Sequence, residues 1–335
     1  IETEEKTIPK EKTILNKEKK VTNNLVEAVT TLNQVAKTIR KKRINNGAII
    51  FDKSEIKFKL DEKNNPKEVV FKTAKSANKL IEEFMLLANR KVAEKMKKGK
   101  ERFVFRVHDQ PDEEKLKNLQ TVVKRLGYNL DLKKNNLNDS LNTLLENTFG
   151  KNEQNLIDTL MIRSMSKAEY TTKNIGHYGL AFDNYTHFTS PIRRYPDVLV
   201  HRLIEAELKN EKIKTEELET LCNHSTHMEI LATKAERDSI KLMQIKYMLD
   251  KEGKIFEAVI SGVTARGVFV EVVENKCEGL VKAKDLPGDF YIHDEKNHQF
   301  VGEKTGKKYQ LGDKTRVMLI KADQVKRRLD FQILS

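Results

Sequence analysis

Residues 177–197 read HYGLAFDNYTHFTSPIRRYPD, and this stretch decides how the chain is interpreted. Its Thr189-Ser190-Pro191 step predicts the start of a helix, because a hydroxyl side chain caps a helix and proline suits the first turn. Arg193 and Arg194 would then lie in that first turn, beside free backbone N–H groups. Guanidinium groups at a helix N-terminus favour phosphate binding. The alternative is a buried corner in which the two arginines pair with carboxylates.

Aromatic residues interleave with this charge, and rings beside arginines can stack on unpaired bases. They are Tyr178, Tyr185, Phe188 and Tyr195. The whole chain has 63 Lys and Arg against 50 Asp and Glu, a net charge of +13. An excess of this size indicates a polyanion such as nucleic acid. The alternative is a surface that carries many solvated lysines.

The length of 335 residues predicts about two domains, and a hydrophobic content of 38% excludes a wholly disordered chain. No run of about 18 apolar residues occurs, so we expect no membrane span. Two cysteines, Cys222 and Cys277, are too few for a disulfide framework, and we expect the reducing cytoplasm. The chain lacks a signal-peptide core and begins at Ile1 without methionine. We therefore expect a trimmed chain or a part of something longer.

Hydrophobic periodicity divides the chain into three parts. Residues 1–21 mix Lys and Glu with few large apolar residues, which predicts a flexible lead-in. Residues 22–251 are helix-rich with a few strands, and residues 252–335 form a separate unit. The expected helices cover 25–43, 76–98, 116–126, 137–146 and 153–164, and the expected strands cover 47–52, a hairpin over 56–71, and 103–107.

Residues 252–335 contain short segments rich in Val, Ile and Phe with glycine between them, which predicts a small antiparallel barrel. A barrel with aromatic residues on a basic face is a platform for single-stranded RNA. Arg266 supplies charge there. For each aromatic residue the alternative position is the barrel core. The candidate stacking residues are Phe256, Phe269, Phe290 and Tyr291.

The residues quoted so far resemble a known family. Residues 177–202 resemble, almost unbroken, the signature near the end of the RNB catalytic domain of RNase R and RNase II exoribonucleases. Residues 81–89, 106–108 and 235–238 resemble further family segments, and the barrel resembles the S1-type OB domain. The RNase R branch fits better. The resemblance implies an α+β fold, in which the helix-rich C-terminal half of an RNB domain precedes an S1 barrel.

The resemblance also implies an activity: processive 3′→5′ hydrolysis of single-stranded RNA to 5′-nucleoside monophosphates, with two Mg²⁺ ions at the scissile phosphate. Arg193 matches the family arginine that contacts the reacting phosphate. Glu82 and Glu236 match carboxylates near the last nucleotides and in the catalytic region. For both glutamates the alternative is an exposed or ion-paired helix carboxylate.

Three more residues are expected to contact RNA. Phe51 matches the family aromatic that clamps the terminal bases, with a core phenylalanine as the alternative. Arg194 and Tyr195 adjoin Arg193 in the signature and offer a second guanidinium and a ring.

The family's magnesium ligands come from clustered aspartates early in the RNB domain, whereas this sequence contains no Asp-Asp or Asp-x-Asp pair. We therefore expect the metal-binding first half of the catalytic domain to be absent and this chain alone to be inactive. Its expected partner is single-stranded RNA. If the protein is split, the missing half is a second partner; if it is not split, we expect a monomer. The competing hypothesis is a non-catalytic RNA-binding protein that keeps the channel and the barrel.

Overall fold

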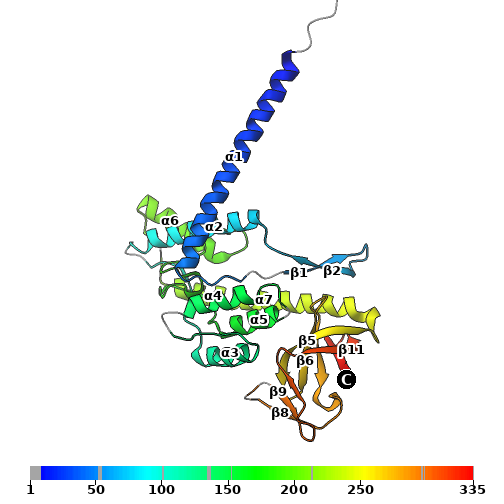
Figure 1. The fold of residues 1–335 in the computed structure, drawn as a ribbon. Helices are drawn as coiled ribbons and strands as arrows, with labels where there is room; N and C mark the ends of the chain where they lie inside the picture. The colour runs from blue at the N-terminus through cyan, green and yellow to red at the C-terminus, as the bar shows by residue number, and fades with distance from the viewer. Residues whose placement is uncertain are drawn as a thin grey trace, which may run out of the picture.

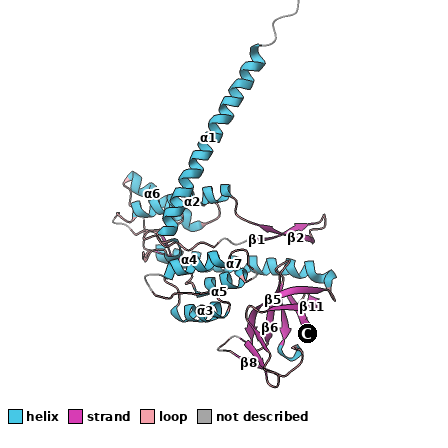
Figure 2. Ribbon diagram, viewed as in Figure 1, coloured by secondary structure: helices cyan, strands magenta, loops and turns pink. Residues whose placement is uncertain are grey.

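The computed structural model describes residues 9–51, 55–99, 102–133, 137–151, 153–212, 214–295, 297 and 299–334. A helix-rich body and a β-barrel lie at opposite ends of the long helix α7 (Leu218–Met248), as Figure 1 shows. Figure 2 shows the same division, with helix concentrated in the body and strand in the barrel. The α+β fold expected from the sequence is confirmed. No helix in the described part of the chain is long and apolar enough to cross a membrane.

The body contains six further helices and two short sheets. The helices are α1 (Pro9–Asn45), α2 (Ser76–Met96), α3 (Glu113–Arg125), α4 (Leu137–Thr148), α5 (Gln154–Ser164) and α6 (Tyr195–Lys209). The strands are β1 (Glu55–Leu60) with β2 (Pro66–Lys72), and β3 (Phe105–Val107) with β4 (Glu169–Thr171); both pairs are antiparallel.

Amphipathic periodicity explains how the body packs. In α3, Leu116, Leu119 and Val123 recur at helical spacing and are buried against Leu141 of α4 and Ile157 of α5. The carboxylate of Asp112 caps α3 by accepting the Lys115 N–H at 3.0 Å. A second core joins α2, β3, α6 and α7. Helices α2, α3, α4 and α5 follow the predicted ranges closely, whereas the sequence analysis gave no range for α6 or α7.

Helix α1 differs from the expectation in two ways. It begins at Pro9, so residues 9–21, which we expected to be a flexible lead-in, are helical, while residues 1–8 lie outside the described residues. Its last turns dock on α2 through Arg43 and the buried Glu83, whose carboxylate accepts the Arg43 Nε at 3.2 Å and Nη2 at 2.5 Å. The rest of α1 projects from the body in Figure 1.

The strand expected over residues 47–52 is not formed. Residues 48–51 run as irregular backbone, and Asp52 lies outside the described residues. The Ile49 N–H donates to the Gly179 carbonyl at 3.0 Å, and the Asn142 side chain donates to the Ala48 carbonyl at 2.9 Å. Loop and side-chain partners thus replace the neighbouring strand that the apolar pattern had predicted.

The C-terminal unit is a closed barrel with strand order β11-β12-β7-β6-β5. The expected small antiparallel barrel is confirmed; the exception to antiparallel pairing among these five strands is β12 with β7, which run parallel at Asp330 and Leu280. Strand β12 thus pairs with β11, its neighbour in sequence, on one side and with β7 on the other, which closes the barrel. The strands are β5 (Ile255–Thr264), β6 (Gly267–Val272), β7 (Glu278–Lys282), β11 (Lys314–Asp323) and β12 (Arg328–Leu334).

A separate three-stranded antiparallel sheet, which the sequence analysis did not predict, lies between β7 and β11 in the chain. It has the order β10-β9-β8, with β8 (Tyr291–Asp294), β9 (Gln299–Gly302) and β10 (Lys308–Gln310). Nearby, the barrel contacts the body: Leu311 is buried with Val122 of α3 and Leu156 of α5. The Arg125 Nη1 also donates to the Gln310 Oε1 at 3.0 Å.

Candidate functional site

The signature segment does not begin a helix at Ser190. Residues 191–193 form a turn in which Arg194 N–H donates to the Ser190 carbonyl at 3.1 Å, and α6 begins at Tyr195 with Pro196 in its first turn. The segment contains two possible helix starts, and the second, with a proline and an aspartate in the first turn, is the one used. Arg193 and Arg194 therefore precede the helix, which corrects the prediction.

Asp197 fixes the shape of this turn. Its carboxylate is fully buried; the Oδ1 accepts the Ser190 N–H at 2.7 Å and the Arg194 Nη2 at 2.7 Å. One arginine is thus folded back and paired, as the alternative interpretation held. The neighbouring Arg193 is exposed, and its guanidinium has no hydrogen bond or ion pair within the part of the chain that the structure describes. The two arginines therefore differ: Arg194 shapes the turn and Arg193 is available to a ligand.

A buried asparagine ties the signature to α2. The Asn89 side chain donates to the Tyr185 Oη at 3.0 Å, and its carbonyl oxygen accepts the Phe188 N–H at 3.0 Å. Asn89 is only 3% exposed. It therefore sets the position of the signature relative to the helix that carries Glu82. Sequence reasoning had noted Asn89 only as part of a family segment.

Two histidines of the signature are held neutral. Burial lowers the pKa of His177 to about 3, and burial with the nearby charge of Arg194 lowers the pKa of His187 to about 2. The His187 Nδ1 lies 2.7 Å from the Tyr170 Oη, and burial raises the pKa of that phenol to about 12. At neutral pH the positive charge here comes from the arginines.

Glu82 and Arg194 line one groove of about 470 Å³, together with Asn89 and Tyr185. The remaining lining residues come from α2. The Glu82 carboxylate is half exposed and lies 3.8 Å from Arg40 Nη1 and about as far from Arg43. The structure thus brings one predicted carboxylate beside the predicted arginine turn. Tyr195, 47% exposed, begins α6 just after that turn.

Glu236 lies farther along α7, in a stretch whose side chains are exposed. It is two helical turns beyond Glu229 and so shares its face of the helix. Glu229 pairs with Arg106 of β3, with Nη1–Oε2 at 2.7 Å and Nη2–Oε1 at 3.0 Å, which joins α7 to the body on that face. Glu236 does not line the groove with Glu82.

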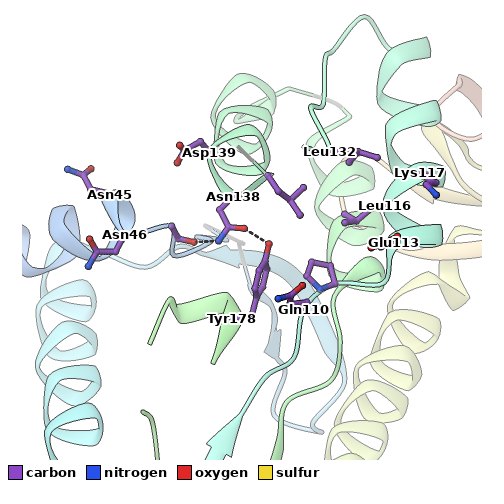
Figure 3. Close-up of a pocket in the computed structure, with 13 residues that line it drawn as sticks. Asn45, Asn46, Gln110, Glu113, Leu116, Lys117, Leu132, Asn138, Asp139 and Tyr178 are labelled. Atoms are coloured by element: carbon purple, nitrogen blue, oxygen red, sulfur yellow. Dashed lines mark hydrogen bonds between the residues drawn. The ribbon is translucent and has the colours of Figure 1, made fainter. Parts of the chain in front are cut away.

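Phe51 and Tyr178 are turned away from the groove. Phe51 is half-buried against the α3–α5 core, in line with its alternative role as a core residue. Tyr178 faces a separate cavity of about 560 Å³ (Figure 3). There its hydroxyl donates to the side-chain Oδ1 of Asn138, and the side-chain Nδ2 of Asn138 donates to the backbone carbonyl of Gly47 at 2.7 Å. Burial raises the pKa of Tyr178 to about 12.

Of the predicted RNA-binding residues of the barrel, some are buried in its core and others reach the surface. Phe256 and Tyr291 are each 7% exposed and pack in the barrel core, so the expectation that they stack on RNA is corrected. Strand alternation turns them inward, and the Tyr291 hydroxyl donates to the Pro287 carbonyl at 3.0 Å. Phe269 is half-buried, and Arg266, in the turn between β5 and β6, is exposed.

The described residues do not fit a magnesium site. Among them no group of three or more His, Cys, Asp or Glu side chains is placed to hold a metal ion. A divalent ion needs several oxygen ligands that converge on one point. Glu82, with its arginine neighbours, and the distant Glu236 do not supply them.

Comparison with protein-family models shows which family this chain belongs to. The family model of the RNB domain matches residues 3–210, more than half of the chain. The chain belongs to the RNB family. The model of the S1 RNA binding domain matches residues 249–334, which include the whole barrel.

Curated relatives of this RNB protein carry the name ribonuclease R. The chain is 38% identical to ribonuclease R of Aquifex aeolicus over 93% of its own length and 45% of the relative. It is 34% identical to ribonuclease R of Escherichia coli over 93% of its length and 40% of the relative. The chain thus spans less than half of these relatives.

A solved structure shares the fold of nearly the whole RNB–S1 chain. The apo form of Mycoplasma genitalium RNase R superimposes with a TM-score of 0.88 at 26% identity, over 93% of this chain and 50% of that one. The structure of yeast Ssd1, described as a pseudonuclease, has a TM-score of 0.59 at 21% identity over 87% of this chain and 35% of that one, and shows the fold alone.

Proposed function

We propose that this chain is the RNA-facing C-terminal part of a 3′→5′ exoribonuclease of the RNase R type. The exposed, unpaired Arg193 carries the proposal. It adjoins an arginine whose charge is already neutralised by Asp197, and that arginine lines the groove with Glu82. A free guanidinium held at a fixed turn is suited to a phosphate with developing negative charge. Relatives named ribonuclease R support this assignment.

The proposed substrate is single-stranded RNA, cleaved to 5′-nucleoside monophosphates. A structural neighbour, RNase R of Mycoplasma genitalium, has been solved in complex with ribose-methylated single-stranded RNA. In this chain Arg193 would hold the phosphate, Tyr195 would contact the RNA beside it, and Glu82 would bind near the terminal ribose. Glu236 would approach the same strand from α7. Phe269 and Arg266 of the barrel would hold RNA upstream.

We propose that the two Mg²⁺ ions of the family are held by polypeptide that this sequence does not contain, since the carboxylates among the described residues do not form the site. The chain alone is then inactive. Both cysteines are free and buried, which supports a reducing cytoplasm.

The test is a nuclease assay on two proteins, the 335-residue chain and the product of the full reading frame that encodes it. With labelled poly(A) and Mg²⁺, only the second should release mononucleotides. Mononucleotide release by the 335-residue chain would refute the division of the site. In the active protein, Arg193→Ala should abolish turnover while RNA binding persists. Arg163→Ala, which removes an exposed arginine on α5, is the control and should leave turnover unchanged.

A second candidate function is non-catalytic RNA binding, favoured by the lack of a metal-ligand cluster in the described part of the chain. It predicts no turnover by either protein, with RNA binding that weakens steeply as salt rises. Turnover by the full-frame product would exclude it.

A further inference from the structure

The small sheet β8–β9–β10 presents an exposed aromatic residue that the proposed site does not use. Phe290, the residue before β8, is 70% exposed, and Ile292 on β8 is 54% exposed. Apolar side chains that lie together on a protein surface mark interaction sites. Sequence reasoning had weighed both Phe290 and Tyr291 as stacking residues. The structure buries the second and leaves the first open.

Strand alternation explains this choice. Tyr291 faces inward, where its ring lies 5.1 Å from the ring of Tyr309. Phe290 and Ile292 therefore face outward. Ile292 of β8 lies opposite Val301 of β9, which in turn lies opposite Lys308 of β10. The outer face therefore carries a row of two apolar residues and a lysine.

The backbone that carries Phe290 is fixed. The Asp289 Oδ1 accepts the Phe290 N–H at 2.7 Å, while its Oδ2 accepts the backbone N–H groups of Lys304 at 3.0 Å and Thr305 at 2.7 Å. A hydrogen bond from the Thr305 hydroxyl at 2.7 Å, together with these backbone bonds, lowers the pKa of Asp289 to about 2. A side chain at Gly302 would lie 2.6 Å from the same carboxylate, so the turn closes tightly only with glycine. A pre-positioned ring loses little entropy when it binds.

The turn that Asp289 holds is basic. Lys304, Lys307 and Lys308 are exposed within five residues, against the carboxylates of Glu303 and Asp289 at the same turn. The Lys307 Nζ lies 5.1 Å from the centre of the Tyr309 ring. A rigid exposed ring beside several lysines matches single-stranded nucleic acid, in which a base stacks on the ring and phosphates lie near the ammonium groups. An acidic protein surface would match the lysines alone, whereas single-stranded RNA matches both the lysines and the ring.

We propose that the outer face of the β8–β9–β10 sheet is a second contact site for single-stranded RNA, with Phe290 stacking on one base and Lys304, Lys307 and Lys308 near the phosphates. The proposal rests on the proposed function in that it takes RNA as the ligand. It adds a site that shares no residue with the groove of Glu82.

The absence of tryptophan from the chain makes the test direct. Phe290→Trp introduces a single indole, whose emission should be quenched when a short oligouridylate binds the 335-residue chain. The control is Phe149→Trp at the end of α4, where the phenylalanine is 65% exposed and lies outside the sheet. Its emission should not change. Unchanged emission at position 290 under saturating RNA, or equal quenching at both positions, would overturn the proposal.

Two further variants measure the contribution of the site. Phe290→Ala should weaken oligouridylate binding about tenfold, the loss of one stacked base. Joint replacement of Lys304, Lys307 and Lys308 by alanine should reduce the salt dependence of log K by about two, because each phosphate contact on single strands contributes about 0.7. Full affinity and salt dependence in both variants would refute the site and leave the proposed function intact. Failure of the unmodified chain to bind RNA at all would instead contradict the proposed function.

Discussion

The Oδ1 of Asp197 lies 2.7 Å from the Nη2 of Arg194, and the carboxylate that makes this contact is wholly buried. The same oxygen also accepts the Ser190 N–H, so one side chain closes both ends of the turn that presents Arg193. Breaking a buried ion pair by removing one partner typically costs 3–5 kcal/mol.

We therefore expect Asp197→Ala to lower the free energy of unfolding by about 3 kcal/mol and to loosen the turn. Urea unfolding of the variant measures the loss. Asp183→Ala, in the exposed loop of the same signature, is the control and should change stability by less than about 0.5 kcal/mol. Equal stability of the two variants would mean that the Asp197–Arg194 pair does not hold the turn.

Asn89 provides the second prediction, because its amide spans two partners across 96 and 99 residues of sequence. Asn89→Ala leaves the Phe188 N–H and the Tyr185 hydroxyl without their partner in a buried place. The expected loss of stability is about 2–4 kcal/mol. Amide hydrogen exchange at Phe188 should also accelerate. Asn118→Ala, at an exposed position of α3, should leave that exchange rate unchanged; slow exchange in the Asn89 variant would contradict the bridging role.

Features set by residues close together in the sequence could be predicted, whereas contacts between residues far apart in the sequence could not. Periodic apolar residues were enough for α2, α3, α5 and the barrel strands, since burial of one face determines such elements. The start of α6 was misplaced because the segment holds two proline-containing start signals, and the choice between them is made by the buried Asp197. The Asn89 bridge has no local signal at all. Phe290 and Tyr291 are adjacent and chemically alike, so only the register of β8 with β9 separates them.

The buried histidines predict an acid-sensitive body. An unfolded chain binds a proton on each imidazole near pH 6.5, whereas folded His177 does so only near a pKa of about 3 and His187 near about 2. Lowering the pH below 6.5 therefore favours unfolding. Each histidine should reduce stability by about 1.4 kcal/mol per pH unit.

The measurement is urea unfolding between pH 6.5 and 5, above the range where carboxylates titrate. His177→Asn should lower the pH slope by about 1.4 kcal/mol per unit. The Nδ1 of His177 has no hydrogen-bond partner among the described residues, so its replacement breaks no side-chain hydrogen bond at that atom, although the ring contacts with His108 and Tyr185 are lost. His224→Asn removes an exposed imidazole and should leave the slope as it is. A slope insensitive to His177 would show that this imidazole is not buried in the neutral form.

Barrel closure depends on the close approach of β7 and β12 at Gly279. A Cβ atom there would lie 2.5 Å from the Phe331 ring and 2.6 Å from the Leu329 carbonyl oxygen, and neither the core ring nor the backbone can move far. Gly279→Ala should therefore lower the stability of the barrel by about 3 kcal/mol or more. Gly262→Ala in β5 is the matched control, because its Cβ would meet Phe269 at an ordinary 3.5 Å. Thermal unfolding is the measurement. The Gly279 variant should lose barrel stability and the Gly262 variant should keep it, whereas a stable Gly279 variant would mean that β7 and β12 can separate without opening the barrel.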